Sequence, residues 1–429
     1  MNSKKPSYRQ YGPNLRVWRP GKLAKGTFAM TVGLGLRTAG QAGVFLIVAR
    51  TLRVEAYGAY AAVLALASAL GSFSGLGVQM IMMREVARDS AIFASAWGAT
   101  LVAIALSTPA LMGIYLLGAW AILPAGISWP VVLFVGVAEL LFAPFSVVTI
   151  TAYQGHDRIG RAAHLVLVPI VPRVAAALAL LLASFVLPMS NLLVTWSGLY
   201  ALAGLVAAIY SGVIVYRDLG LPVMPNARML RNYAREGLAF ALSGTALKLY
   251  TDIDKTMLAR LNTLEGAGAY SAAHRLVDMV GVPLQALFGA AAPRFFSEGE
   301  AGTRRVTRYA LRILPFPIIY AVVFGSLLFE MADLMPRLLG NSFAPAVDTL
   351  RWLAWLPLAA TLRRFLQVTF VASGRQYVTS FAVMVGAALN VILNLWAIPR
   401  WGIHGAVLAT YGAEAAMMGV LVIVALRAQ

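Results

Sequence analysis

"ARTLRVEAYGAYAA", residues Ala49 to Ala62, returns 210 positions later as "ARLNTLEGAGAYSA", Ala259 to Ala272. Seven of the fourteen positions are identical in register, whereas chance in a chain rich in alanine and leucine would give roughly one or two. Three further pairs keep nearly the same offset: Arg37 with Lys248, Pro188 with Pro399, and Tyr200 with Tyr411. The alternative, coincidence from biased composition, explains the doubled stretch less well than an internal duplication.

The composition predicts an all-α polytopic membrane protein. Hydrophobic residues make up 60% of the 429 residues and charged residues only 12%, with a mean hydropathy of +0.76. A bilayer core about 30 Å thick needs about 20 apolar residues per spanning helix. Runs of that length predict about twelve spans, near 26–49, 57–82, 95–118, 128–153, 161–187, 192–216, 237–259, 267–293, 310–334, 346–372, 377–399 and 404–426.

The position of the repeat predicts how the spans are grouped. Six spans separate the two copies, and because six is even, both halves run through the membrane in the same direction. We therefore expect two six-helix lobes related by a parallel pseudo-two-fold repeat. The predicted divisions are a basic cytoplasmic tail at 1–25, an N-lobe at 26–216, a cytoplasmic linker at 217–236 and a C-lobe at 237–429.

Basic residues mark one side of the membrane rather than a nucleic-acid surface. Net charge is +18, with 35 Lys and Arg. Of these, 22 fall on the side of the N-terminal tail and five on the opposite side, which by the positive-inside rule predicts that both termini are cytoplasmic. Part of the excess charge would hold that face to anionic membrane lipid.

The chain offers little for catalysis. It has no cysteine, and its four histidines, His156, His164, His274 and His404, have no metal-ligand spacing. No nucleotide-phosphate loop or paired-carboxylate motif is present, and no outer loop exceeds about a dozen residues. We therefore expect no metal and no cofactor, and a protein that is not an enzyme; a membrane polymerase or glycosyltransferase is the rival interpretation.

Charged residues inside the spans are the candidates for function. In "LAFALSGTALKLYTDIDKTMLARL", Lys248, Asp252 and Lys255 fall within about 60° of one another on a helix. An ion at mid-bilayer costs about 3 to over 10 kcal/mol, so each charge must face a partner or water. Other spans add Arg37, Glu139, Arg173, Arg275, Asp278, Arg363 and Arg364.

Two interpretations of these charges stay open. Lys248, Asp252 and Lys255 could simply neutralise one another and pin helices together. The functional interpretation is a hydrated cationic cavity that binds an anionic headgroup, since guanidinium and ammonium donors suit phosphate oxygens. Its basic residues would be Arg37, Arg173, Lys248, Lys255, Arg275, Arg363 and Arg364. Asp252, Asp278 and Glu139 would bind a coupling proton or sodium ion, Glu414 and Asp348 are further carboxylates of that kind, and Asp254 points away from the stripe.

Several stretches resemble a known family. They are "VARTLRVEAYGAY", "GLGVQMIMMREVA", "GAYSAAHRLVDMVGVPLQALFGAAAPRFF" and "ALNVILNLWAIPRWGIHGAVLATYGAE". Together they resemble the multidrug/oligosaccharidyl-lipid/polysaccharide (MOP) exporter superfamily, and within it the flippases of O-antigen-type polysaccharide repeat units. The resemblance implies a MATE-like pair of lobes around a central cavity in the bacterial inner membrane.

The same resemblance implies a cargo. An undecaprenyl-pyrophosphate-linked oligosaccharide would be moved from the cytoplasmic to the periplasmic leaflet by alternating access, and a polysaccharide polymerase and export proteins would be partners. Arg275, in "AHRL", resembles a basic cavity position of lipid II flippases. A lipid II flippase and a multidrug or cation antiporter of the same superfamily are the alternatives. Drug antiporters carry cations, so the basic cavity favours the glycan flippase.

Overall fold

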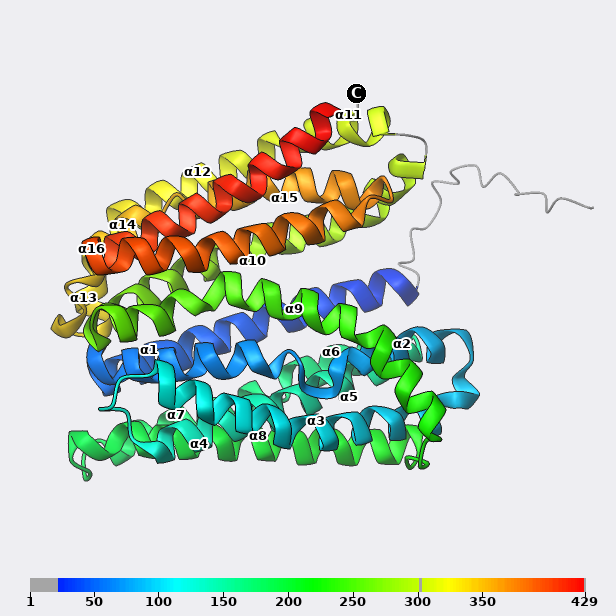
Figure 1. Cartoon of the computed structure of the whole chain (residues 1–429), viewed down its shortest axis with the longest axis horizontal. Helices are drawn as coiled ribbons and strands as arrows, with labels where there is room; N and C mark the ends of the chain where they lie inside the picture. The colour runs from blue at the N-terminus through cyan, green and yellow to red at the C-terminus, as the bar shows by residue number, and fades with distance from the viewer. Residues whose placement is uncertain (1–21, 301–302, 428–429) are drawn as a thin grey trace, which may run out of the picture.

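The computed structural model describes residues 22–300 and 303–427, and within these ranges the regular structure is entirely helical. The long helices lie side by side along the longest axis of the molecule (Figure 1). In the first half of the chain they are α1 (Lys22–Gly71), α2 (Val78–Arg88), α3 (Phe93–Ile122), α4 (Trp129–Val137), α5 (Ala143–Gly155), α6 (Ile159–Leu167), α7 (Ile170–Ala183) and α8 (Met189–Leu219). In the second half they are α9 (Ala227–Leu261), α10 (Leu264–Glu300), α11 (Thr303–Ile313), α12 (Pro315–Glu330), α13 (Met335–Leu339), α14 (Ala346–Leu353), α15 (Leu356–Ala372) and α16 (Gln376–Arg427).

Two of these helices turn back on themselves. The backbone of α1 leaves the helical region at Arg53, with φ 62° and ψ 174°, and that of α16 leaves it at Gly402, with φ 54° and ψ −126°. Each helix therefore contains two runs joined by an elbow. Short helices fill the remaining turns: η1 (Ser74–Gly77), η2 (Ser90–Ile92), η4 (Met331–Leu334) and η5 (Asn341–Phe343), with a π-helical turn, η3 (Ala138–Phe142).

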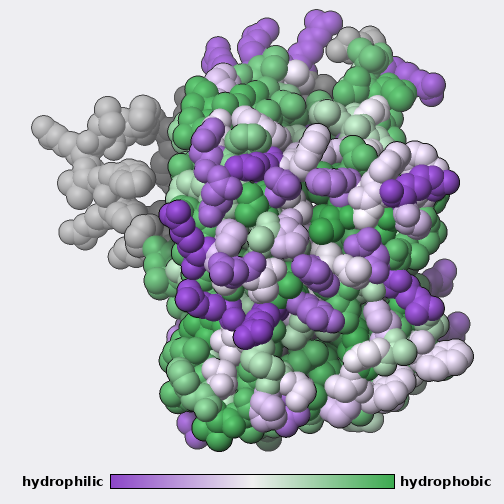
Figure 2. All heavy atoms as spheres, turned by 90° about the vertical axis from the view of Figure 1, so that its left-hand side faces the viewer, coloured by the Kyte–Doolittle hydropathy of each residue, from purple (hydrophilic) through white to green (hydrophobic). Residues whose placement is uncertain are grey.

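The outer surface suits a bilayer. Seven helical segments of the described chain are long and apolar enough to cross a membrane. Helix α9 is not among them, and its residues 237–254 carry Lys248, Asp252 and Asp254. Large apolar side chains such as Trp120, Phe185 and Leu408 lie exposed. At the end that holds the α1 elbow, hydrophilic side chains cross the middle of the face and hydrophobic ones flank them (Figure 2). The count of twelve spans stays a prediction.

The two halves of the chain occupy two sides of the molecule. Helices α1–α8 lie on one side and α10–α16 on the other, with α9 between them (Figure 1). The names N-lobe and C-lobe are kept for residues 26–216 and 237–429. The expected linker, 217–236, is extended only from Gly220 to Asn226, and α9 begins at Ala227, where the Asn226 side chain accepts a hydrogen bond from the Met229 N–H at 2.7 Å.

The two copies of the doubled stretch form two corresponding turns, and they also join the lobes. The first copy contains the Arg53 elbow, and the second contains the break between α9 and α10. A Cβ on Gly58 would lie 1.9 Å from the carbonyl oxygen of Leu264, and one on Gly268 would lie 1.9 Å from that of Val54. These four positions correspond at offset 210, so equivalent residues pack reciprocally across the lobe boundary. Only glycine permits such close backbone approach.

Candidate functional site

The N-lobe charges gather around Tyr200. Arg173 Nη2 of α7 donates to the Tyr200 hydroxyl of α8 at 3.1 Å, and its guanidinium carbon lies 4.9 Å from the centre of that ring. The hydroxyl donates in turn to Glu139 Oε1 at 2.5 Å. Glu139 sits in the π-helical turn η3, and such turns often occur at functional sites. Arg173 Nε is buried and has no hydrogen-bond partner in the described part of the chain.

Arg37 is one of two members of the basic set that have no side-chain partner in the described ranges; Arg364 is the other. It lies exposed on α1, and within residues 22–300 and 303–427 its side chain makes no hydrogen bond or ion pair. Arg173 and Arg275 are close enough to act on it electrostatically. Arg275, from α10, also points Nη2 toward Gln41 Oε1 of α1 at 3.5 Å. The electrostatic influence of Arg173 and Arg275 therefore reaches Arg37 from both lobes.

The stripe on α9 forms an ion-pair ladder. Lys248 Nζ lies 3.5 Å from Asp252 Oδ2, and Lys255 Nζ pairs with the other oxygen of the same carboxylate. The Lys248 side chain is 49% exposed, whereas that of Lys255 is 13% exposed. One carboxylate thus serves two ammonium groups. Lys248 is therefore the member of the ladder that can exchange its partner for a ligand.

Asp254 and Asp278 have other partners. Asp254 is 1% exposed and accepts a hydrogen bond from Tyr270 of α10, as expected for a residue that points away from the stripe. Asp278 Oδ2 lies 3.1 Å from His274 Nδ1, one turn earlier on α10. The histidine is buried. The carboxylate therefore belongs to a histidine pair rather than to Arg275.

Arg363 lies in a separate and closed cluster. Its Nε is 2.6 Å from Glu414 Oε2, its Nη2 is 3.2 Å from Oε1, and its Nη1 is 2.8 Å from Gln367 Oε1. Tyr250 of α9 also donates to Glu414. Arg363 is 8% exposed and Glu414 is 3% exposed. This geometry favours the pinning of α15 to α16; the neighbouring Arg364 makes no hydrogen bond or ion pair within the described ranges.

The structure thus separates the expected site residues. Arg173 and Arg275 act electrostatically on Arg37, and Arg173 is linked to Glu139 through the Tyr200 hydroxyl. Lys248, Asp252 and Lys255 form their own ladder, and Arg363 is bound elsewhere. Sequence reasoning missed Tyr200, Tyr250 and Gln41 as partners of these charges. Tyr200 and Tyr411 occupy corresponding positions in the repeat, but their contacts differ. The Tyr200 hydroxyl bonds to Arg173 and Glu139, whereas the Tyr411 hydroxyl donates to the Trp352 carbonyl at 2.8 Å.

The fold is that of known membrane transporters. A MATE family multidrug resistance transporter of the MOP superfamily, in an inward-facing conformation, superimposes with a TM-score of 0.69 at 13% identity, over 94% of this chain and 97% of that one. The lipid II flippase MurJ, in an inward closed conformation, gives 0.71 at 10% identity, over 93% and 87%. The expected MATE-like, all-α fold is confirmed, and the long apolar helices are those of a multi-pass membrane protein.

The sequence comparison narrows the class. The polysaccharide biosynthesis protein family matches residues 23–298, which is more than half of the chain. The protein belongs to that family. One similar relative is Agl15 of Haloferax volcanii, a probable low-salt glycan biosynthesis flippase, with 24% identity over 212 residues. This match covers 49% of the present chain and 44% of Agl15, so it spans less than half the length of that relative.

Proposed function

We propose that this protein is a flippase that moves undecaprenyl-pyrophosphate-linked oligosaccharide repeat units from the cytoplasmic to the periplasmic leaflet by alternating access. Membership of the polysaccharide biosynthesis protein family supports a role in glycan assembly. The name of Agl15 supports flipping as the activity. The bacterial inner membrane, with both chain termini cytoplasmic, is the proposed location.

The observation that carries the proposal is the convergence of Arg37, Arg173 and Arg275. They come from α1, α7 and α10, and Arg37 has no carboxylate partner in the described ranges. Uncompensated guanidiniums at membrane depth are expensive unless water or an anion reaches them. A pyrophosphate supplies several oxygens of the geometry that arginine donors prefer.

The placement of the three arginines also fits alternating access. Arg37 and Arg173 belong to the N-lobe, and Arg275 belongs to the C-lobe. An anion held between them would be gripped by both lobes in one state and released as the lobes part. Lys248, whose side chain is about half exposed and weakly paired, would receive the phosphates next. A cavity of this sign disfavours the cationic cargo of a drug antiporter.

The proposed coupling of transport to protons or sodium ions is assigned from the hydrogen-bond and ion-pair partners of the carboxylates. Asp252 is held between two lysines, and Asp278 pairs with His274. Glu139 is hydrogen-bonded only by Tyr200 among the described residues. We therefore place proton or sodium coupling at Glu139 ahead of Asp252 and Asp278. A polysaccharide polymerase and export proteins remain the proposed partners.

Gene deletion followed by analysis of lipid-linked oligosaccharides in each leaflet tests the function. We expect complete repeat units to accumulate in the cytoplasmic leaflet and surface glycan to be lost. Complementation with Arg37→Ala should fail, whereas Arg260→Ala, the same change at the C-terminal end of α9, should restore surface glycan. Unchanged surface glycan with increased sensitivity to cationic drugs would replace the flippase with an antiporter.

A further inference from the structure

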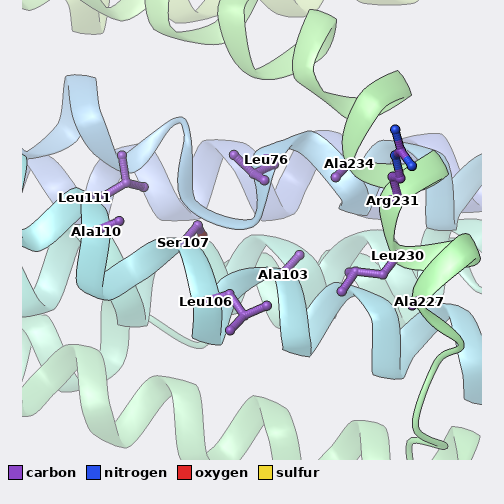
Figure 3. A pocket seen from close by; sticks show the side chains of 10 residues that line it. All are labelled: Leu76, Ala103, Leu106, Ser107, Ala110, Leu111, Ala227, Leu230, Arg231 and Ala234. Atoms are coloured by element: carbon purple, nitrogen blue, oxygen red, sulfur yellow. The ribbon is translucent and has the colours of Figure 1, made fainter.

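A groove in the described part of the chain is lined by none of the charged residues of the candidate site. The groove, of about 500 Å³, runs between α3 and the first turns of α9, and Leu76 of η1 also lines it. We name it the α3–α9 groove. All but two of its lining residues are alanine or leucine (Figure 3): Leu76, Ala103, Leu106, Ala110, Leu111, Ala227, Leu230 and Ala234, with Ser107 and Arg231 as the exceptions.

The inside of the groove suits hydrocarbon. Ser107, its polar lining residue, already accepts a hydrogen bond from the Gly75 N–H at 2.9 Å, so it offers little to a sugar or phosphate. The volume of the α3–α9 groove falls within the range of small-molecule pockets, about 300–1,000 Å³. Leu106 is 66% exposed at the rim. At 1.5 Å per residue, the lining residues of each helix span about 10–12 Å, or roughly a third of the bilayer core.

One end of the groove is basic. Arg228, Arg231 and Arg235 follow one another at spacings of three and four, which places them within about 60° on α9. All three are exposed, and within the described ranges none makes a hydrogen bond or ion pair. The neighbouring carboxylate, Glu236, is taken by Arg84 at 2.7 Å. In Figure 3 Arg231 lies at the end of the groove formed by Ala227 and Ala234, with its guanidinium turned away from the apolar lining.

We propose that the α3–α9 groove holds part of the polyprenyl chain of the lipid-linked cargo, with the pyrophosphate at Arg231, Arg228 and Arg235. This inference rests on the proposed function. An apolar slot that ends in unpaired arginines matches a lipid with one long hydrocarbon chain and a concentrated anionic headgroup. The basic end belongs to the side of the chain that holds most of the Lys and Arg, where the cargo is loaded.

The same helix connects this loading site to the cavity. From Arg235 to Lys248 is thirteen residues along α9, or about 20 Å. Lys248 lies about 100–160° around α9 from Arg228, Arg231 and Arg235, so the basic end of the groove and the Lys248 ladder occupy different faces of this helix. The groove therefore determines which lipid enters, whereas Arg37, Arg173 and Arg275 act on the headgroup during transport.

The test uses the full-length protein in detergent, with undecaprenyl pyrophosphate as the probe and native mass spectrometry as the readout. Ala234→Phe fills the groove and Arg231→Gln removes the cation. We expect each change to weaken binding about tenfold, the loss of one charge-assisted hydrogen bond in the second case. Leu117→Phe on the exposed face of α3 and Arg260→Gln at the far end of α9 are the matched controls, and both should bind as the parent does.

The outcomes separate this inference from the proposed function. If the parent protein binds the probe and the two groove variants bind and restore surface glycan equally well, the groove assignment is wrong and the flippase stands. If phosphatidylglycerol displaces the probe at equal concentration, the groove is an ordinary membrane-lipid site and the assignment is also wrong. If the parent binds no probe and gene deletion leaves surface glycan intact, the proposed function fails first.

Discussion

Each lobe contains a cluster of one arginine, one glutamate and one tyrosine, and the two clusters are connected differently. In the N-lobe, Tyr200 stands between Arg173 and Glu139, and Arg173 keeps a buried Nε without a partner in the described ranges. In the C-lobe, Arg363 binds both oxygens of Glu414 directly, and Tyr250 adds a third hydrogen bond to that carboxylate.

This difference distinguishes a cluster that holds helices together from one that can bind a ligand. In the C-lobe pair both carboxylate oxygens are occupied, and Nε, Nη1 and Nη2 of Arg363 each already donate to a side chain. The N-lobe cluster leaves a guanidinium partly unsatisfied beside Arg37 and Arg275. Identical residue types therefore hold helices together in one lobe and leave a guanidinium partly unsatisfied in the other.

Breaking the C-lobe cluster should have the largest effect. Glu414→Ala leaves Arg363 buried without its counter-ion, and removal of one partner of a buried pair costs about 3–5 kcal/mol. We expect a clearly lower midpoint of thermal unfolding in detergent. The double change Arg363→Met with Glu414→Leu should recover most of the loss, because no stranded charge remains. An unchanged midpoint for Glu414→Ala would contradict the assignment of this cluster as a helix pin.

Breaking the N-lobe cluster should affect transport instead. Arg173→Ala is expected to lower lipid-linked oligosaccharide export at least about tenfold, as loss of one charge-assisted contact predicts. Protein level and unfolding midpoint should change less than for Glu414→Ala. Export rates in membrane vesicles, normalised to protein amount, provide the measurement. Equal loss of stability from both changes would remove the distinction between the lobes.

The two tyrosines sharpen the comparison. Tyr200→Phe removes the hydroxyl that bonds to both Arg173 and Glu139, so each of these side chains loses that hydrogen-bond partner. Tyr250→Phe, by contrast, leaves the direct Arg363–Glu414 ion pair intact. We expect Tyr200→Phe to cost about 1–3 kcal/mol and Tyr250→Phe about 1 kcal/mol. Denaturant or thermal unfolding of both variants under one condition compares them. A larger cost for Tyr250→Phe would reverse the interpretation.

The smallest expected effect on stability is at Lys248. Its side chain is about half exposed and lies 3.5 Å from Asp252, and such exposed pairs contribute about 0–1 kcal/mol. Lys248→Gln should therefore leave the unfolding midpoint almost unchanged while lowering export. Lys255→Gln, at a buried position of the same ladder, should lower the midpoint more. Export equal to that of the parent in Lys248→Gln would exclude Lys248 from the path of the headgroup.

Sequence periodicity predicted the main features of the fold. The doubled stretch predicted two related halves, and its copies do form the elbows and pack reciprocally through Gly58 and Gly268. Helical spacing put Lys248, Asp252 and Lys255 on one face of α9, and it turned Asp254 away toward Tyr270. The superfamily was also predicted from the sequence. These results depend on the spacing of residues within one helix or on an internal repeat. Both can be read directly from the order of residues in the sequence.

The partners of the charges came only from the tertiary structure. Arg363 and Glu414 are 51 residues apart, and Arg275 and Gln41 are 234 apart. Neither contact joins residues of one helix or equivalent positions of the two halves, so neither helical periodicity nor the repeat could predict it. Periodicity fixes the face that a side chain occupies on its own helix. The packing of the helices decides which helix meets that face and whether it brings a carboxylate, a tyrosine or an unoccupied space. A charge in the low-dielectric interior is stable only where the fold supplies a partner for it.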